Sequence, residues 1–316
     1  MEHAAFDEPL FMIWQADKCA MLGVNQVAQA EVDLAYAREA QIQLVRRQSG
    51  GGTIYTDRGT LLYTLILPET DGKSTQEIIR ELFAAPMIRA LNKLSIPAVM
   101  EGRNDLLVDG KKFSGMAQYA RKGRVCSHGS LLVDTDLDTL ARVLAVDAEK
   151  IASKAIPSVR SRVTNLCEHM DTPLSALDFW QLLEEKLAEE WQLKPYELTA
   201  SDLVEIDQIY QKKFGNADWT FGKSPPFALH HSMRFPAGKV ELFLDVSKGN
   251  IRACTICGDF LGTRPTRALE ERLEGLALQY DAVDAALQTL DLTPYLGAIT
   301  REQLLTCMFG EGALSP

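Results

Sequence analysis

The stretch Arg46-Arg47-Gln48-Ser49-Gly50-Gly51-Gly52 ("RRQSGGG") lies between strand-like segments in the first half of the chain. "IQLVRR" precedes it, and "TIYT" and "LLYTLILP" follow it, so the glycines link strands of a sheet. Three consecutive glycines lose much conformational entropy on folding, and a tight turn needs one or two. The run therefore predicts either a turn or a loop that brings bare backbone beside the two arginines to bind an anion. The pattern matches neither a P-loop nor a Rossmann fingerprint.

The composition is that of a folded globular protein with one large core and a smaller domain. The chain has 316 residues, of which 46% are hydrophobic and 24% charged, and its net charge is -10. This acidic balance argues against nucleic acid as a partner. The first residues lack the basic region of a signal peptide, and no apolar run is long enough for a membrane span. With six scattered cysteines expected to be reduced, we expect a cytoplasmic protein with no membrane partner.

Periodicity predicts alternating strands and helices along the chain. A β-hairpin is expected at 10–24, with "QADK" as its turn, and a helix at 29–42. A second helix is expected at 74–94, opened by a Ser74 cap. The apolar residues of 178–193 repeat with the helical period.

A new unit is expected after the prolines at 225 and 226, with two strands around a "SKGN" turn followed by helices. We place the boundary near Leu229 to His231, which gives a catalytic domain over 1–229 and an accessory domain over 232–316.

A second cluster, "GRNDLLVDGKKFSGMA" at 102–117, carries carboxylates, two lysines and an Asp109-Gly110 hairpin signal. This combination suits a Mg²⁺–nucleotide site, since magnesium prefers oxygen ligands and an ammonium stabilises phosphate charge. A solvated hairpin with charged edges explains the same residues equally well. Alternation places Lys111 and Lys112 on opposite faces, so one of them is expected to point into a site.

Two further clusters follow. His128, in "CSHGSLL", stands at the entrance to an apolar strand and is either a ligand contact or a structural histidine. Cys126 lies two residues away, but strand neighbours rarely form a thiolate–imidazole pair. The basic segment 154–166, "KAIPSVRSRVTNL", is either a loop that closes over a nucleotide or an ordinary connection.

Taken in order, the four clusters resemble the lipoate–protein ligase family. R-R-x-S-G-G-G-x-x-Y-x-D stands at 46–57, R-N-D-L-x-x-[DN]-G-x-K-x-S-G-x-A stands at 103–117, and "HGSLL" and "SVRSRVTNL" follow. The region 217–260 resembles the accessory domain of the longer ligases. The resemblance implies an α/β (α+β) fold, with a large mixed-sheet domain like that of biotinyl and lipoyl transferases and a small C-terminal α+β domain.

The resemblance also implies a two-step reaction. Lipoate and MgATP would give lipoyl-AMP and pyrophosphate. The lipoyl group would then pass to a lysine of an apo lipoyl domain, either of a 2-oxoacid dehydrogenase E2 subunit or of the glycine-cleavage H protein. Lys112 would be the catalytic residue between the carboxylate and the α-phosphate, and Asp105 would lie by Mg²⁺. The implied lipoyl and lipoyl-AMP contacts are Arg47, Ser49, Gly50, Gly51, Gly52, His128, Gly129 and Ser130. The implied ATP contacts are Asn104, Asp105, Lys112, Ser114, Gly115, Ala117, Val159 and Arg160.

Four departures from the family pattern leave two other readings open. Val24 and Val27 stand where an arginine and an asparagine are usual, and Thr56 and Thr60 replace a histidine and an asparagine. These changes put the choice between lipoate and octanoate in doubt. An ATP-independent octanoyl or lipoyl transferase acting through a cysteine, or a non-catalytic lipoate-binding protein, would also use parts of the pattern. Nothing in the sequence requires more than a monomer.

Overall fold

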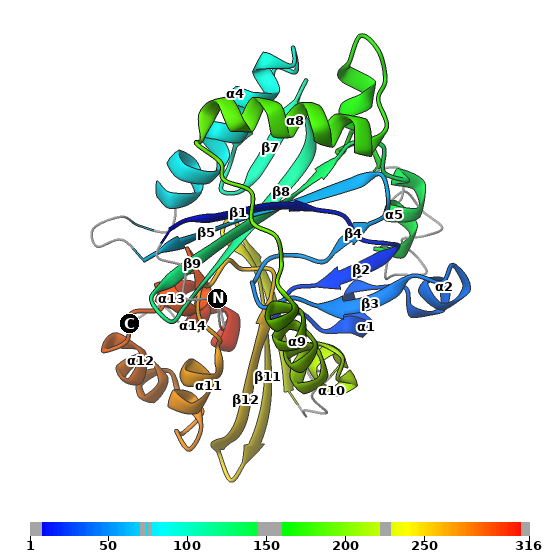
Figure 1. The fold of residues 1–316 in the computed structure, drawn as a ribbon. Coiled ribbons are helices and arrows are strands. Elements are labelled where there is room, and N and C mark those ends of the chain that lie inside the picture. Colours follow the sequence, from blue (N-terminus) through cyan, green and yellow to red (C-terminus); the bar gives the residue numbers. More distant parts are fainter. Residues whose placement is uncertain (1–7, 70–73, 75–76, 145–159, 222–228, 311–316) are drawn as a thin grey trace. The chain divides into compact units, whose positions relative to one another are not determined.

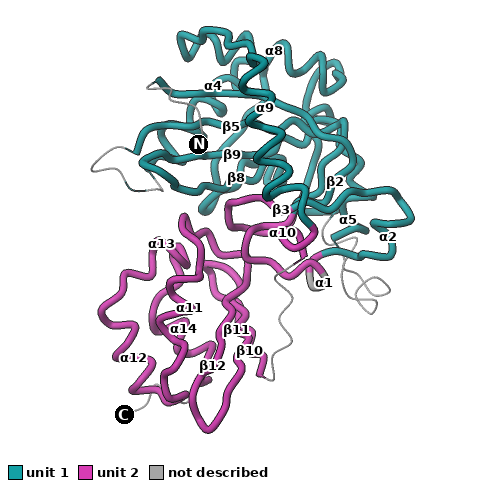
Figure 2. The backbone as a smooth tube through the Cα atoms, turned by 60° about the horizontal axis from the view of Figure 1, so that its bottom comes forward, with its two compact units in different colours: residues 1–21, 32–45, 54–216 teal, residues 22–31, 46–53, 217–316 magenta. Residues whose placement is uncertain are grey.

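The computed structural model describes residues 8–69, 74, 77–144, 160–221 and 229–310 (Figure 1). Contacts between Cα atoms divide the chain into two compact units, which Figure 2 shows in different colours. Unit 1 comprises residues 1–21, 32–45 and 54–216, and unit 2 comprises residues 22–31, 46–53 and 217–316. No helix among the described residues is long and apolar enough to cross a membrane.

Unit 1 is built on a six-stranded sheet with the order β1-β5-β9-β8-β7-β6. Every neighbouring pair in this sheet is antiparallel. Its strands are β1 (Leu10–Trp14), β5 (Thr60–Pro68), β6 (Val99–Glu101), β7 (Asp105–Val108), β8 (Lys111–Arg121) and β9 (Arg124–Leu132). A smaller sheet has the order β3-β2-β4, from β2 (Cys19–Leu22), β3 (Gln43–Arg46) and β4 (Ile54–Thr56).

The predicted N-terminal hairpin is wrong in its pairing, although both strands exist. β1 pairs with β5, whereas β2 pairs with β4. The residues between them, Gln15 to Lys18, therefore connect two sheets. A hairpin signal from two short apolar runs cannot tell which partner each strand will bury itself against.

Helices pack on one face of the large sheet and form the core of unit 1 (Figure 1). The predicted periodic face of α8 (Ala176–Glu190) is confirmed, because Phe179, Leu183 and Leu187 are all buried. α4 (Ala85–Lys93) follows the π-helical turn Ile78–Ala84 and packs beside α8. The predicted Ser74 cap is also confirmed, since the Glu77 N–H donates to Ser74 Oγ. The remaining helical elements of unit 1 are α2 (Leu34–Glu39), α5 (Leu137–Val143), the 3₁₀ turn Leu166–His169, α9 (Ala200–Ile209) and the π-helical turn Tyr210–Phe214.

Unit 2 has its own three-stranded antiparallel sheet and its own core. The strands expected around the "SKGN" turn are present, and Lys248 and Gly249 adopt the positive φ angles that this turn requires. The strands are β10 (Leu229–Phe235), β11 (Gly238–Ser247) and β12 (Asn250–Gly258). The helices are α1 (Ala28–Glu31), α10 (Ala217–Phe221), α11 (Arg267–Leu273), α12 (Tyr280–Gln288), α13 (Thr293–Leu296) and α14 (Arg301–Phe309).

The division of contacts differs from a simple split of the sequence. The predicted boundary near Leu229 to His231 falls at the start of β10. Two earlier segments, 22–31 and 46–53, nevertheless pack with the C-terminal residues. The second of these segments is the glycine loop with its two arginines.

Candidate active site

A β-bulge decides where the predicted catalytic lysine points. Leu107 lies opposite Lys112, but Leu106 lies opposite Ser114, so Phe113 is an extra residue in β8. Without this bulge, Lys112 and Ser114 would share a face by alternation. With it, Phe113 and Ser114 are both buried toward the helices, and Lys112 turns to the other side of the sheet. Bulges are frequent where a strand re-aims a functional side chain.

The Lys112 side chain forms an ion pair with an acidic neighbour and occupies space that a glycine leaves open. Lys112 Nζ lies 2.7 Å from Asp105 Oδ1, and both side chains remain partly exposed. Asp105 pairs with Gly115 across the two strands. A Cβ atom at Gly115 would lie 3.1 Å from Lys112 Nζ, so the absence of a side chain there makes room for the ammonium. The sequence therefore brings together three of its predicted ATP contacts at one point of the β7–β8 hairpin.

Two other predicted ATP contacts are engaged in holding this hairpin. Asn104 Nδ2 donates to the Met116 carbonyl, and the Met116 N–H donates to the Asn104 carbonyl, at 2.8 Å in both cases. Ser114 is fully buried, and its Oγ lies 3.3 Å from the Tyr63 hydroxyl. The Ser114 side chain therefore faces the core and not the side that carries Lys112.

The third predicted motif shares the face of Lys112. Ala117 lies opposite His128, and Ser130 is two residues further along β9. Directly opposed residues of antiparallel strands point to the same face. We call this side of the sheet the Lys112 face, defined by Asp105, Lys112, Gly115, Ala117, His128 and Ser130. Gly129 points the other way, where a Cβ atom would meet the Tyr63 ring at 2.7 Å, so this glycine makes room for a core side chain.

The fourth motif runs beside Lys112 as a backbone strap, defined here as residues 160–169. The Lys112 N–H donates to the Arg162 carbonyl at 2.9 Å, and the Thr164 N–H donates to the Lys112 carbonyl at 3.0 Å. These bonds form a parallel bridge between Lys112 and Val163. The strap thus takes the edge of β8 that β9 leaves unpaired at this point.

One of the two predicted contacts at the start of the strap can be placed. The Arg160 guanidinium lies 3.7 Å from Asp138 and 3.9 Å from Glu168, and it lines a small hollow of about 80 Å³ with Asn165. Val159 lies outside the described residues, as do Lys154 to Ser158.

The glycine loop of unit 2 is closed by its own arginine. Arg47 Nε donates to Ser49 Oγ at 3.0 Å, and Arg47 Nη2 donates to the carbonyls of Gly50 and Gly52 at 2.8 and 2.7 Å. Burial lowers the pKa of Arg47 to about 10. In this conformation the predicted anion donor holds the loop together.

The three glycines of the loop differ in what a side chain at each position would contact. A Cβ atom at Gly50 would lie 2.6 Å from the Phe260 carbonyl, and the Gly51 N–H donates to that same carbonyl at 3.2 Å. Gly51 also has a φ of +86°, which favours glycine. At Gly52, in contrast, a Cβ atom would meet nothing within 4 Å. Packing therefore accounts for the first two glycines, and only the third leaves open backbone.

Arg46 is a structural arginine, which the residue pattern alone, without the family resemblance, did not distinguish from Arg47. Its buried guanidinium donates to the carbonyls of Gly23, Gln26 and Thr220 at 2.6 to 3.0 Å. Burial lowers the pKa of Arg46 to about 10. It thereby joins the two early segments of unit 2 to α10.

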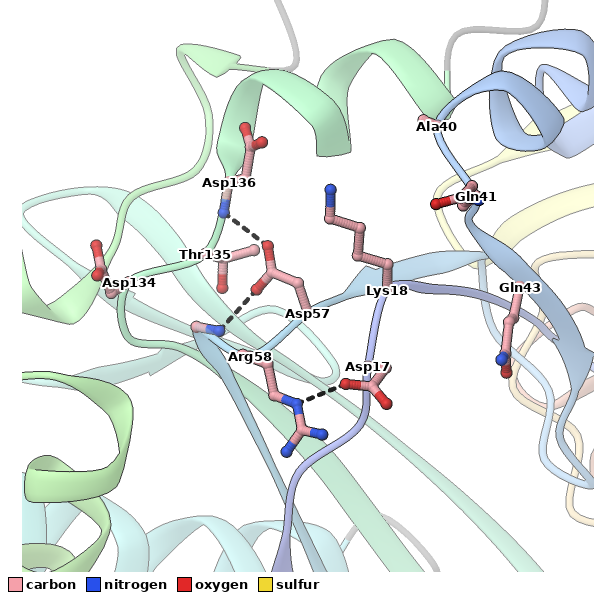
Figure 3. Close-up of a pocket in the computed structure, with 11 residues that line it drawn as sticks. Asp17, Lys18, Ala40, Gln41, Gln43, Asp57, Arg58, Asp134, Thr135 and Asp136 are labelled. Atoms are coloured by element: carbon pink, nitrogen blue, oxygen red, sulfur yellow. Dashed lines mark hydrogen bonds and ion pairs between the residues drawn. The ribbon is translucent and has the colours of Figure 1, made fainter.

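A hollow of about 660 Å³ in unit 1 is lined by none of the predicted site residues (Figure 3). Asp57, from the Y-x-D part of the glycine motif, lines it, but both carboxylate oxygens are engaged. Asp57 Oδ1 accepts from the Gly59 N–H at 2.8 Å, and Oδ2 accepts from the Asp136 N–H at 2.9 Å. Lys18 and Arg58 also line the hollow, and Arg58 pairs with Asp17 at 2.6 Å. Asp57 thus fastens the β4–β5 turn to the start of α5.

Two of the residues that depart from the family pattern can be placed by their contacts. The Val24 N–H donates to the Ser49 carbonyl at 2.9 Å, a contact that needs no particular side chain. Thr60 Oγ1 lies 2.8 Å from Thr135 Oγ1, within a buried pair. Cys126, the thiol nearest the motifs, is buried, and burial raises its pKa to about 11, which makes it a poor nucleophile.

Comparison with known proteins identifies the family. A family model described as the lipoyl protein ligase A/B catalytic domain matches residues 1–188, and one described as the bacterial lipoate protein ligase C-terminus matches residues 224–308. The chain belongs to the lipoate–protein ligase family. It is 36% identical over 312 residues to the lipoate-protein ligase LplJ of Bacillus subtilis, which covers 98% of this chain and 93% of that protein.

Solved structures agree with this assignment. A bipartite lipoate protein ligase from Thermoplasma acidophilum, solved with its E2 lipoyl domain, is similar with a TM-score of 0.63 and 29% identity over 71% of this chain and 88% of that one. A lipoate-protein ligase A bound with ATP has a TM-score of 0.59 and 27% identity over 68% and 87% of the two chains. The family, the mixed α/β fold class with a small C-terminal domain and the enzyme class predicted from the motifs are confirmed: the protein is a lipoate–protein ligase.

Proposed function

We propose that the protein activates lipoate with MgATP on the Lys112 face and transfers the lipoyl group to a lysine of an apo lipoyl domain. The observation that carries this proposal is the bulge at Phe113, which puts Lys112 on the same face of the sheet as Ala117 and His128 and leaves its ammonium beside Gly115. The ATP-bound ligase of similar fold supports the choice of nucleotide.

In the first step, a carboxylate oxygen of lipoate attacks the α-phosphorus of ATP. A carbon–oxygen–phosphorus linkage forms. The bond between the α-phosphorus and the oxygen that bridges it to the β-phosphorus breaks, and pyrophosphate leaves. The Lys112 ammonium stabilises the negative charge on the oxygens shared by the two reactants. Binding of ATP draws Lys112 from Asp105 toward phosphate, because the two side chains are partly exposed and the ion pair can exchange partners.

Asp105 is the carboxylate that fits a magnesium ion in this scheme. Among the described residues, no three His, Cys, Asp or Glu side chains gather as a metal cluster. The Asp105 carboxylate is partly exposed beside Lys112, and a single carboxylate can serve Mg²⁺, which is commonly held by one or two carboxylates together with substrate phosphates and water. Bound there, Mg²⁺ would neutralise phosphate charge. Asn104 and Asp105 would be the protein residues beside the ion.

In the second step, the amine of the acceptor lysine attacks the acyl carbon, an amide bond forms, and AMP leaves. We assign contacts with the acyl-adenylate to His128 and Ser130 on the Lys112 face, and to Arg160 at the start of the strap. Arg47, Ser49 and Gly52 are assigned to the lipoyl group, because Gly52 leaves its backbone open. The Thermoplasma ligase solved with its E2 lipoyl domain supports an E2 acceptor, and the H protein is the alternative.

Two neighbouring lysines provide a matched test of the catalytic assignment. Lipoate-dependent pyrophosphate release from MgATP should fall at least 100-fold in Lys112→Ala. It should change less than threefold in Lys111→Ala, whose side chain is exposed on the opposite side. Retention of the full adenylation rate in Lys112→Ala would refute the assignment.

A further inference from the structure

His169 joins two segments that both hold the backbone of Lys112. Its Nδ1 lies 3.0 Å from Asp109 Oδ2, at the turn of the β7–β8 hairpin. Its Nε2 lies 3.0 Å from Thr164 Oγ1, in the strap. Thr164 is fully buried, and its N–H donates to the Lys112 carbonyl. We call these three side chains, Asp109, His169 and Thr164, the clamp.

The two ends of the clamp differ in how firmly they are placed. Asp109 has a φ of +49° and Gly110 a φ of +73°, the conformation of a tight hairpin turn, and the Asp109 side chain is largely exposed. Thr164 at the other end is fixed in the strap, which Leu166 and Asn165 anchor to the core and to Thr135. The imidazole therefore links an exposed turn to a fixed segment.

The hydrogen-bond partners determine the proton positions. The Asp109 carboxylate accepts, so His169 Nδ1 must carry the hydrogen. In the neutral ring, Nε2 then accepts from the Thr164 hydroxyl. In the imidazolium, Nε2–H donates to Thr164 Oγ1, whose own hydrogen can turn to Glu168 Oε2 at 3.2 Å. Both protonation states leave the clamp closed.

We propose that His169 is a positioning residue for adenylation, which holds the β7–β8 hairpin against the strap so that the backbone of Lys112 stays in place and its ammonium can reach the phosphate from the Lys112 face. This inference rests on the proposed function. The hairpin carries Lys112 three residues beyond Asp109, so a turn released from the strap lets the bulged strand shift. A displacement of 1 Å at a reacting group can lower a rate about 100-fold.

The test compares His169→Leu with His169→Asn, whose amide can still donate to Asp109. The expected result for His169→Leu is an adenylation kcat about tenfold lower, with the KM values for ATP and lipoate within twofold of wild type. His169→Asn should recover most of the rate. Asp109→Asn keeps a residue that tolerates positive φ, and the double variant with His169→Leu should be no slower than His169→Leu alone. His230→Gln removes a histidine beside Glu241 in unit 2 and should leave adenylation unchanged.

A second readout reports the clamp without turnover. The chain has five histidines, so the imidazole ¹⁵N spectrum of the full-length protein can be assigned by substitution. One neutral ring with its hydrogen on Nδ1 should disappear in His169→Leu and shift in Asp109→Asn. An Nε2–H tautomer for His169 would overturn the clamp.

The kinetic outcomes separate the two claims. If the wild-type enzyme shows no lipoate-dependent pyrophosphate release, the proposed function fails and the positioning role fails with it. If the wild type turns over and His169→Leu keeps its kcat within twofold, only the inference is overturned. A loss in His169→Leu that consists of raised KM values and a lowered Tm would mean a purely structural histidine and would overturn it too.

Discussion

Replacing Gly115 with alanine should move the Lys112 ammonium without removing it. The added Cβ atom would lie 3.1 Å from Nζ and 3.2 Å from Cε, where ordinary contact begins at about 3.4 Å. The flexible lysine end must retreat by a few tenths of an ångström or more. Since a 1 Å misplacement can cost about 100-fold, we expect adenylation to slow about three- to tenfold. Alanine suits a strand at least as well as glycine, so the Tm should not fall.

The assay is lipoate-dependent pyrophosphate release at saturating MgATP, measured in a double-mutant cycle. Gly115→Ala should slow the enzyme in the wild-type background and have no further effect in Lys112→Ala, because its effect acts through that ammonium. An equal loss in both backgrounds, or no loss in the first, would refute the reasoning that Gly115 acts by making room for Lys112.

Three further predictions concern unit 2. Gly50→Ala should destabilise the fold by roughly 1–3 kcal/mol and so lower the Tm, because the added Cβ atom overpacks against the Phe260 carbonyl. Gly52→Ala should leave the Tm unchanged and raise the KM for lipoate. Equal Tm values for the two variants would contradict the packing argument. Arg46→Gln should destabilise the protein by about 3 kcal/mol in urea, because several buried carbonyls lose a charged donor; a change below about 0.5 kcal/mol would exclude this role. Burial raises the pKa of Glu31 to about 7, so the folded state holds a proton that the unfolded state releases near pH 4.5, and stability falls as pH rises between these values. Glu31→Gln should therefore add about 1–2 kcal/mol at pH 8 and much less at pH 5, measured by urea denaturation; equal gains at both pH values would count against it.

Motifs in the sequence were sufficient to predict the family and the small C-terminal domain, and to predict that Asp105, Lys112 and Gly115 lie together. They worked because each motif is local, and its residues come together within one hairpin or one strap. The Asp109-Gly110 turn and the opposite orientations of Lys111 and Lys112 follow from turn chemistry and alternation alone.

The rest depends on contacts that local patterns do not encode. Alternation alone would have placed Lys112 and Ser114 on one face, and only the extra residue Phe113 separates them. The glycine run suggested ligand approach at three positions. Gly50 and Gly51, however, pack against the Phe260 carbonyl, which lies more than 200 residues later in the chain. His169 carried no motif signal, since its partners lie in separate segments and meet only after folding.

The site residues remain predictions that substitution can test. Arg47 is an example: its donors close the glycine loop in this structure, and a role toward lipoate requires that some of these bonds exchange for the ligand. Such an exchange is chemically available, because charge-assisted bonds to carbonyl oxygens can be replaced by bonds to a carboxylate.

ATP-dependent lipoylation is tested most directly by the intact mass of an apo E2 lipoyl domain after incubation with the enzyme and lipoate, with and without MgATP. The lipoyl mass should appear only when MgATP is present, and Lys112→Ala should abolish it while Lys111→Ala should not. A mass increase that needs no MgATP, or one that survives in Lys112→Ala, would contradict it.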